Sequence, residues 1–289
     1  PTDTGPIDTT PVSIAADHPD LQYTGRIDDS DPAAPDFNWP GTSVRANFEG
    51  TSLKVHLDDH GDNWVNVIID GGEPAVLDCE EGLNTYVVAE GLGDGVHSVE
   101  INKRTELGEG ALSFAGFELD PGADLVDPPV RPELRIEFFG DSITSGYSVD
   151  CKCDEALPEY KNNYLTYAGY TARALGADYH SISVSGLGIV QSWWDATIQD
   201  YWSSLVGYDY AWDFTSWVPH IVVINLGQND KWLGVGPEIV DAYVGFMGQV
   251  REQYPDAEIF LALGLVVKFL GELLAELGEL QFIRRRQSC

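Results

Sequence analysis

The stretch that decides the fold is RIEFFGDSITSGY, residues 135–147. It begins with a short apolar run, Arg135–Phe139, and continues into the turn Gly140-Asp141-Ser142. An apolar run that ends in a glycine turn predicts a buried strand leading towards a helix. Ser142 then lies at the carboxyl end of the strand, where open α/β sheets form their sites. An isolated Gly-Asp-Ser is commonly a helix cap, so this motif alone does not establish a nucleophile.

Strands and helices alternate after this stretch. Asn163 is expected to cap a helix that ends at Gly176, and Pro237 to open a second long helix. Further strands are expected at residues 181–185, 221–226 and 259–263. This alternation predicts a parallel sheet covered by helices on both faces, over residues 135–264.

The preceding part of the chain has a different period. Apolar and polar residues alternate from about residue 21 to 120, and Gly- and Asp-rich turns separate the short runs. This pattern predicts an antiparallel β-sandwich of the jelly-roll type. The Pro-rich residues 121–134 are expected to be an interdomain linker, and residues 1–20 a loose leader.

Two further turns are expected at the same sheet edge as Ser142. Ser185-Gly186-Leu187-Gly188 follows the second predicted strand, and Gly227-Gln228-Asn229-Asp230 follows the third. The backbone N–H groups of Ser142 and Gly186 and the side-chain amide of Asn229 would then converge as an oxyanion hole for acyl transfer. Asp141 and Asp230 are expected to order their turns by hydrogen bonds rather than to act as catalytic acids.

These three turns resemble the motifs of the SGNH (GDSL-type) hydrolases, and the sandwich in front of them narrows the resemblance to carbohydrate esterase family 2. The resemblance covers roughly residues 21–264. It also includes Gly25-Arg26, Phe37-Asn38-Trp39, Ile69-Asp70-Gly71, Lys103-Arg104-Thr105-Glu106 and Gly140–Tyr147. It implies a jelly roll followed by a three-layer SGNH hydrolase domain that removes acetyl groups from plant polysaccharides such as xylan and mannan. It also implies that Ser142 is the nucleophile, that Ser142, Gly186 and Asn229 form the oxyanion hole, and that no metal or organic cofactor takes part.

The sequence departs from the family in its fourth motif, a His near the C-terminus. No His follows residue 220. His180 and His220 are expected near the starts of their strands, at the opposite end of the sheet from Ser142. His97 is expected to be a satisfied core residue, and the other three, His18, His56 and His60, lie in the leader or the sandwich. No His is therefore predicted to act as the general base.

Residues 265–289 differ from the rest of this acidic chain. They hold four basic residues against three acidic ones, and Arg284–Arg286 are consecutive. This tail begins where the His motif is expected. We therefore interpret it as the result of a truncation or reading-frame error, with a genuine C-terminal amphipathic helix as the alternative.

Composition limits the partners. The chain has 47 acidic and 16 basic residues, a net charge of −31, which argues against nucleic acid and anionic membrane surfaces. No stretch approaches the ~20 apolar residues of a membrane span. The acidic composition favours a secreted protein whose signal peptide is gone or was never there, and we expect a monomer. Cys151 and Cys153 could form a disulfide or stay free thiols.

Six of the eight Trp residues lie between residues 193 and 232. Most are expected to pack in the core, but Trp193, Trp194 and Trp232 follow the active-edge turns, and Trp232 is the predicted substrate contact. The leading hypothesis is a secreted esterase acting on acetylated polysaccharide or oligosaccharide. The alternatives are a carbohydrate-binding protein without catalysis and a lipase or general esterase of the same superfamily.

Overall fold

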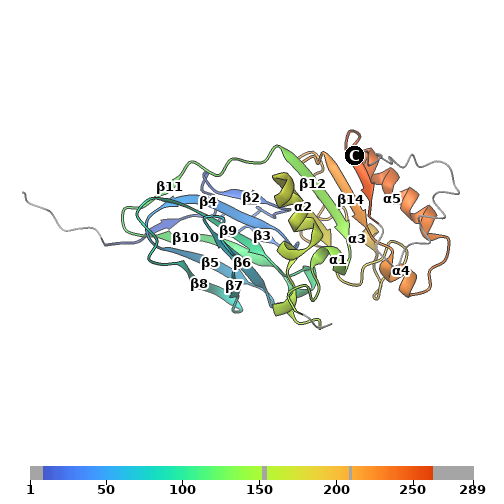
Figure 1. Ribbon diagram of the computed structural model, residues 1–289, viewed down its shortest axis with the longest axis horizontal. Helices are drawn as coiled ribbons and strands as arrows, with labels where there is room; N and C mark the ends of the chain where they lie inside the picture. The colour runs from blue at the N-terminus through green and yellow to red at the C-terminus, as the bar shows by residue number, and fades with distance from the viewer. Residues whose placement is uncertain (1–8, 152–154, 208–209, 263–289) are drawn as a thin grey trace, which may run out of the picture.

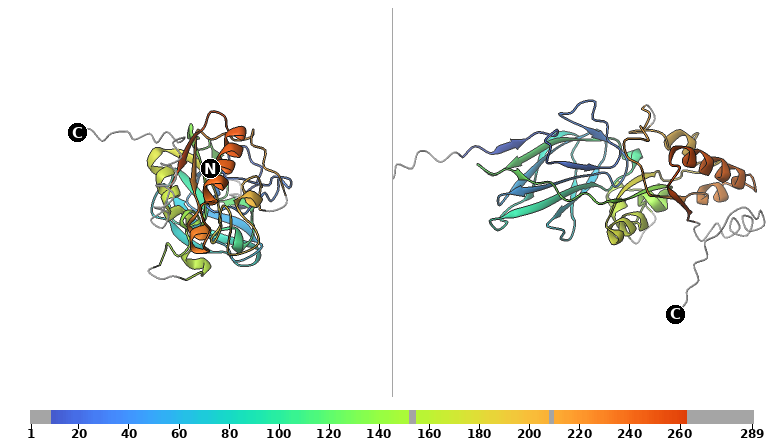
Figure 2. Two further views of the ribbon diagram at one scale, coloured as in Figure 1. Left: turned by 90° about the vertical axis from the view of Figure 1, so that its right-hand side faces the viewer. Right: turned by 90° about the horizontal axis from the view of Figure 1, so that it is seen from above.

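The structure is a computed structural model, and it describes residues 9–151, 155–207 and 210–262. An antiparallel β-sandwich and a parallel α/β domain lie end to end along the long axis (Figures 1 and 2). No helix among these residues is long and apolar enough to cross a membrane.

Two antiparallel sheets form the sandwich. The first has the order β1 (Val12–Ile14), β10 (Leu112–Leu119), β5 (Leu53–Asp59), β8 (Gly82–Ala89), and β3 (Asp36–Phe37) also pairs with β10. The second has the order β11 (Leu125–Val126), β4 (Ser43–Glu49), β9 (Val96–Lys103), β6 (Trp64–Ile69), β7 (Ala75–Asp78), and β2 (Gln22–Thr24) also pairs with β4. The predicted antiparallel sandwich is confirmed.

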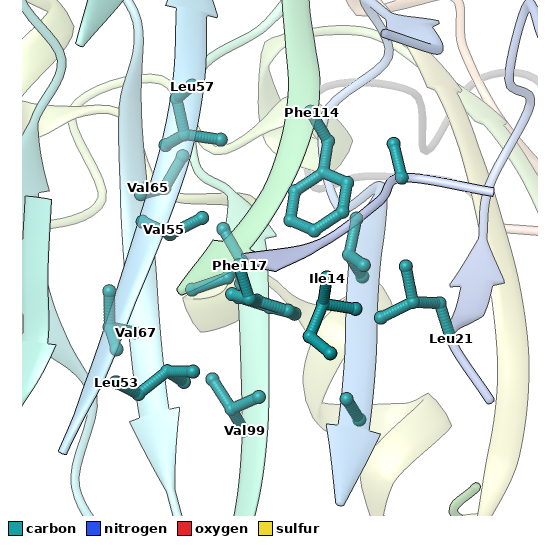
Figure 3. Close-up of a cluster of buried hydrophobic side chains, with 14 of the residues drawn as sticks. Ile14, Leu21, Leu53, Val55, Leu57, Val65, Val67, Val99, Phe114 and Phe117 are labelled. Carbon is teal, nitrogen blue, oxygen red and sulfur yellow. The ribbon is translucent and has the colours of Figure 1, made fainter. Parts of the chain in front are cut away.

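The sandwich core follows from the two-residue period of its strands. In β5, Leu53, Val55 and Leu57 are fully buried while Lys54 and His56 between them are not. They pack against Phe114 and Phe117 of β10 (Figure 3). Alternate side chains of a strand point to opposite faces, so one face of each sheet supplies the core.

Two segments expected to be irregular contribute strands instead. In the leader, Val12–Ile14 pairs with β10 and Ile14 is buried, so the prediction of a loose leader is wrong there. In the linker, Leu125–Val126 pairs with β4, and Asn47 donates a hydrogen bond to the carbonyl of Asp127 at 2.8 Å. Strands of two or three residues are too short to show a period, and edge pairing forms them.

The α/β domain has a four-stranded parallel sheet in the order β13 (Ala177–Ser183), β12 (Leu134–Gly140), β14 (Ile221–Asn225), β15 (Glu258–Leu261). Helix α2 (Tyr167–Leu175) covers one face and α5 (Ile239–Gln253) the other (Figure 1). Residues of β12 alternate between them, since Phe138 packs near α2 and Phe139 against Phe246 of α5. The predicted three-layer architecture is confirmed.

The remaining helical segments are short and lie in the connections. They are α1 (Ser142–Ser145), α3 (Ile198–Tyr201) and α4 (Gln228–Trp232), with 3₁₀ turns η1 (Leu107–Glu109), η2 (Pro158–Tyr160) and η3 (Asn163–Leu165).

The predicted cap at Asn163 is wrong. Thr166 caps α2 by accepting a hydrogen bond from the backbone N–H of Gly169, because the Asn163 amide instead binds the carbonyl of Thr144 at 2.8 Å. The helix does end at Gly176, in the left-handed conformation that glycine favours. The predicted tail at 265–289 lies outside the described residues.

Candidate active site

The carboxyl ends of three neighbouring strands bring the predicted site residues together. Gly140 at the end of β12 is in register with Ser183 of β13 and with Asn225 of β14. The turns that follow them line one pocket of about 400 Å³. Its lining includes the predicted nucleophile, both other oxyanion residues and the predicted sugar contact, namely Ser142, Tyr147, Ser185, Gly186, Trp193, Gln228, Asn229 and Trp232.

Ser142 opens the short helix α1. The buried side chain of Asp141 caps this helix by accepting a hydrogen bond from the backbone N–H of Ile143 at 3.0 Å. Ser142 is the first helical residue, so no carbonyl within the helix satisfies its backbone N–H. Within the described ranges, no side chain or backbone group makes a hydrogen bond to its hydroxyl oxygen. Both groups of Ser142 are therefore available to a substrate in the pocket.

Gly186 provides the second predicted donor. Its φ of +83° lies in the left-handed region, and a Cβ atom there would lie 2.6 Å from the indole of Trp194. Only glycine meets both demands without strain. The carbonyl of Gly186 accepts a hydrogen bond from the backbone N–H of Trp193 at 3.2 Å, which fixes the peptide that follows.

Asn229 is the third predicted donor, and hydrogen bonds orient its side-chain amide. Its Oδ1 accepts a hydrogen bond from the indole N–H of Trp193 at 3.0 Å. Its Nδ2 donates to the carbonyl of Leu187 at 2.8 Å and lies 3.5 Å from Asp141 Oδ2. The contact with Asp141 is long and therefore weak, so this is the N–H that a developing oxyanion would take over. Sequence reasoning missed Trp193 as the group that fixes the amide.

Two buried carboxylates hold the turns in place, as predicted. Asp230 accepts hydrogen bonds from the backbone N–H groups of Ile189, Val190 and Gln191 at 2.9, 2.6 and 2.8 Å. Burial raises the pKa of Asp141 to about 7, and the nearby charges of Asp230 and Glu106 add to this rise. Asp141 faces its own helix and Asn229, so it orders the turn and does not reach the Ser142 hydroxyl as a base.

The histidines of the α/β domain lie away from this edge. His180 is in register with Glu137 of β12, and the backbone of His220 binds Arg135. Arg135 is near the start of β12, but Glu137 is its midpoint and His180 is the fourth of the seven residues of β13, so the prediction that His180 lies at the start of its strand is wrong. Both histidines still lie before the carboxyl ends of the strands, whereas Ser142 follows the end of β12. The prediction for His97 was half right. It is satisfied by Asp70 at 2.7 Å and by the carbonyl of Gly93 at 2.8 Å, but it lies at the half-buried margin rather than in the core.

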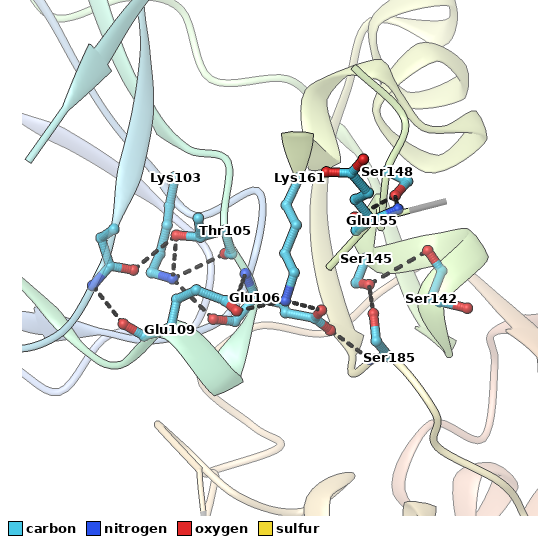
Figure 4. A network of polar contacts seen from close by, with 11 residues as sticks. Lys103, Thr105, Glu106, Glu109, Ser142, Ser145, Ser148, Glu155, Lys161 and Ser185 are labelled. Atoms are coloured by element: carbon cyan, nitrogen blue, oxygen red, sulfur yellow. Dashed lines mark hydrogen bonds and ion pairs between the residues drawn. The ribbon is translucent and has the colours of Figure 1, made fainter. Parts of the chain in front are cut away.

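The sandwich also reaches the site, which sequence reasoning missed. Glu106 lies three residues beyond the end of the sandwich strand β9. It accepts a hydrogen bond from the backbone N–H of Ser185 and forms an ion pair with Lys161 at 2.8 Å (Figure 4). Lys161 also pairs with Glu109 at 2.5 Å. Burial disfavours the ammonium, yet Glu106 and Glu109 together hold the pKa of Lys161 above its usual value.

A second hollow of about 530 Å³ adjoins the Ser142 pocket. The two share Tyr147 and Ser185, and the second is walled by Glu106 and Leu107 of the sandwich and by Trp194 and others of the α/β domain. In the part of the chain that the structure describes, no group of three His, Cys, Asp or Glu side chains could hold a metal ion. Cys151 is disulfide-bonded, and Cys79 is a buried free thiol.

Comparison with known families identifies the class. Residues 23–129 match the family model for the N-terminal domain of carbohydrate esterase 2, and residues 138–284 match the GDSL-like lipase/acylhydrolase family. The second match extends into the tail after residue 264. Two matched domains in this order mean that the chain belongs to carbohydrate esterase family 2, within the GDSL-type hydrolases, as the sequence resemblance predicted.

Particular relatives agree with this assignment. An acetylxylan esterase/glucomannan deacetylase of Cellvibrio japonicus is 30% identical over 273 residues, which cover 85% of this chain and 74% of the relative. The cellulase/esterase CelE of Acetivibrio thermocellus is 37% identical over 256 residues, which cover 86% of this chain and 31% of CelE. The chain therefore spans less than a third of CelE.

A solved structure has the same fold. A family two carbohydrate esterase from Clostridium thermocellum, in complex with cellohexaose, superposes with a TM-score of 0.82 at 34% identity. The match covers 89% of this chain and 82% of that one.

Proposed function

We propose that this chain is a serine esterase that removes O-acetyl groups from a plant polysaccharide such as xylan or mannan, outside the cell and as a monomer. One observation carries the proposal: Ser142, Gly186 and Asn229 line a single pocket beside exposed indole rings. The names of its relatives, acetylxylan esterase and glucomannan deacetylase, support the substrate class. Their role as carbohydrate-degrading enzymes supports the location.

The chemistry follows from the geometry. The hydroxyl oxygen of Ser142 attacks the acetyl carbonyl, and its proton must pass to a base. The tetrahedral intermediate places its negative oxygen on the N–H groups of Ser142 and Gly186 and on the Asn229 amide. The intermediate collapses to an acyl-enzyme as the sugar hydroxyl leaves with a proton, and water then releases acetate.

The base is the part that this sequence does not supply. No His follows residue 220, and the described histidines lie away from Ser142. Loss of the His from a Ser–His system lowers turnover on the order of a millionfold and leaves the contributions of the oxyanion hole and of binding. We therefore expect the 289-residue chain to release acetate slowly by itself.

The test restores a base from solution. Imidazole at increasing concentration should raise acetate release from an aryl acetate by the wild-type chain, because the pocket beside Ser142 is open to a small molecule. Ser142→Ala, in the same imidazole buffer, measures the reaction of imidazole itself. A rate above that background that vanishes in Ser142→Ala supports the proposal. Equal rates for both proteins would refute Ser142 as a nucleophile.

The missing His favours a second candidate, a carbohydrate-binding protein without catalysis. In that case the wild-type chain and Ser142→Ala would bind acetylated xylan equally well, and neither would release acetate above the background of imidazole itself. Activity that increases with acyl length would instead indicate a general esterase.

A further inference from the structure

We infer that Glu106 is a positioning residue: through it the sandwich domain fixes the turn that carries the Gly186 oxyanion donor. The inference deepens the proposed function and rests on it for its kinetic readout. It rests on the structure alone for the position of the turn.

Two carboxylates fasten the turn at its opposite ends. At its start, the backbone N–H of Ser185 donates to Glu106 Oε2. At its end, three consecutive N–H groups, of residues 189–191, donate to Asp230. Glu106 is 2% exposed and Asp230 fully buried, so water does not compete effectively for either contact. Gly186 lies between these two anchors.

The anchors come from different parts of the fold. Asp230 belongs to α4 of the α/β domain, directly after Asn229. Glu106 belongs to the sandwich, 79 residues from Ser185 in the sequence. The sandwich therefore contributes a wall of the site and determines where the turn begins (Figure 4).

Glu106 is itself held on several sides. Lys161 of the α/β domain lies 2.8 Å from its Oε1. Its carbonyl accepts a hydrogen bond from the buried ammonium of Lys103 at 3.3 Å, and its backbone N–H donates to Glu109 at 3.2 Å. Because both the backbone and the carboxylate of Glu106 are held, this residue can fix the position of Ser185.

A fixed position matters here because of the adjacent peptide. Glu106 fixes the N–H of Ser185, and Trp193 fixes the carbonyl of Gly186, so the Gly186 N–H between them has one direction. Oxyanion donors contribute to catalysis only when they are already aligned before the reaction. A displacement of about 1 Å in such a site can cost about 100-fold in rate.

The experiment shortens Glu106 without removing its charge. In Glu106→Asp the carboxylate retracts by one methylene and no longer reaches Ser185, while the flexible Lys161 side chain can follow it. Glu118→Asp is the matched control, because it removes the same methylene from another sandwich glutamate that pairs with a lysine, Lys54, and contacts neither Glu106 nor Ser185.

Two readouts are needed. Amide hydrogen exchange at Ser185 should become about tenfold faster in Glu106→Asp and stay unchanged in Glu118→Asp, while residues 189–191, held by Asp230, stay protected in both. In the imidazole-assisted reaction, kcat should fall about 10- to 100-fold in Glu106→Asp with KM within about twofold, because only the transition state uses the Gly186 donor.

Glu106→Gln keeps the side-chain length and an acceptor oxygen, so we expect an intermediate effect in both readouts. If Glu106→Asp does not fold, the result for Glu106→Gln decides whether the inference holds. Unchanged exchange at Ser185 in Glu106→Asp, or equal effects of the Glu106→Asp and Glu118→Asp variants, would overturn the inference. If the wild-type chain releases no Ser142-dependent acetate, the proposed function fails, and the exchange measurement still decides whether Glu106 positions the turn.

Discussion

The parallel sheet buries carboxylates in two regions, and it uses them differently. In the first region, halfway along β12, Glu137 pairs with Arg26 at 2.8 Å, and both side chains are 0% exposed. In the second region, beyond the carboxyl ends of the strands, Asp141 and Asp230 accept hydrogen bonds from backbone N–H groups instead of from cations. The first region is a closed ion cluster, called the closed end below, and the second, called the open end, leaves a neutral set of donors around an open pocket.

The closed end joins the two domains. Arg26 enters from the sandwich and also donates to the carbonyls of Trp202 and Ser204, at 2.8 and 2.6 Å. His180 lies 3.8 Å from Glu137 and stacks on Trp217 with ring centroids 3.7 Å apart. Burial lowers the pKa of His180, so it stays neutral, and the charge of the cluster is that of Arg26 and Glu137.

Charge pairing explains why the closed end tolerates its charges. Burial alone would raise the pKa of Glu137, but the charge of Arg26 and the hydrogen bonds from Arg26 and His180 together outweigh burial and hold this pKa below its usual value. At the open end, no cation among the described residues lowers the pKa of Asp141, so burial dominates and this pKa rises to about 7. The difference shows what a cation beside Asp141 would do. It would hold the Asp141 carboxylate in its ionised form, but it would also place a charge at the edge of the pocket.

The largest expected effect comes from breaking the closed end. Arg26→Met leaves Glu137 buried without its cation, and we expect a loss of about 3–5 kcal/mol in the free energy of unfolding. Urea denaturation followed by tryptophan fluorescence measures it.

The double variant Arg26→Met/Glu137→Leu is the control. It removes both charges and should recover most of the loss, because an apolar pair of similar volume avoids the cost of burying an ion. If the single variant is as stable as the double, the pair contributes nothing and the contrast between the two ends fails.

The next effect is a pH dependence at the open end. The pKa of Asp141 rises from 3.8 to about 7 on folding. Between these values the unfolded chain ionises Asp141 while the folded chain keeps it protonated, so the free energy of unfolding falls as pH rises from about 4 to about 7. The fall amounts to up to about 4 kcal/mol. Asp141→Asn keeps the acceptor that caps α1 and cannot ionise. Its free energy of unfolding should therefore increase relative to that of the wild type as pH rises across this range.

A second carboxylate provides the control with the opposite sign. Hydrogen bonds from Ser52 and Thr51 hold the pKa of Asp120 below its usual value. Asp120 therefore adds stability that is lost as pH falls. The free energy of unfolding of Asp120→Asn should decrease relative to that of the wild type as pH rises. Unfolding curves from pH 3 to pH 8 for the three proteins measure both slopes, and parallel curves for the wild type and Asp141→Asn would contradict the assignment.

The open end was predictable from the sequence because its parts are local. Each site residue follows an apolar strand within a few positions, and parallel strands end at one edge, so Ser142, Gly186 and Asn229 could be placed together without coordinates. The turns at Asp141 and Asp230 were predictable for the same reason.

The closed end and Glu106 were not predictable in this way. Arg26 and Glu137 are 111 residues apart, and Glu106 and Ser185 are 79 apart, each pair joining two domains. Such contacts leave no periodic signal, and only the resemblance drew attention to Gly25-Arg26 and to Lys103-Arg104-Thr105-Glu106. The orientation of Asn229 by Trp193 also depends on a side-chain contact across 36 residues.

The tryptophans divide between the two ends in the same manner. Trp202 packs in the core as expected, whereas Trp212 and Trp217 pack on Arg26 and His180 at the closed end and are half-buried. Trp193 and Trp232 line the open pocket and are 58% and 73% exposed. A mostly exposed indole has most of its surface left for a ligand.

The smallest expected effect on stability tests this division. Trp232→Ala should change the free energy of unfolding by no more than about 0.5 kcal/mol, since the side chain is mostly exposed. The same variant should bind cello- or xylo-oligosaccharides about tenfold more weakly, which corresponds to about 1.4 kcal/mol and is typical of an aromatic contact at a binding site.

Tyr170→Ala, on the exposed face of α2, is the control: it removes an aromatic ring outside the pocket and should leave affinity unchanged. Titration calorimetry on all three proteins makes the comparison. Equal affinities for the wild type and Trp232→Ala would show that the exposed indole is not part of the sugar site, and the open end would then consist of Ser142 and its donors alone.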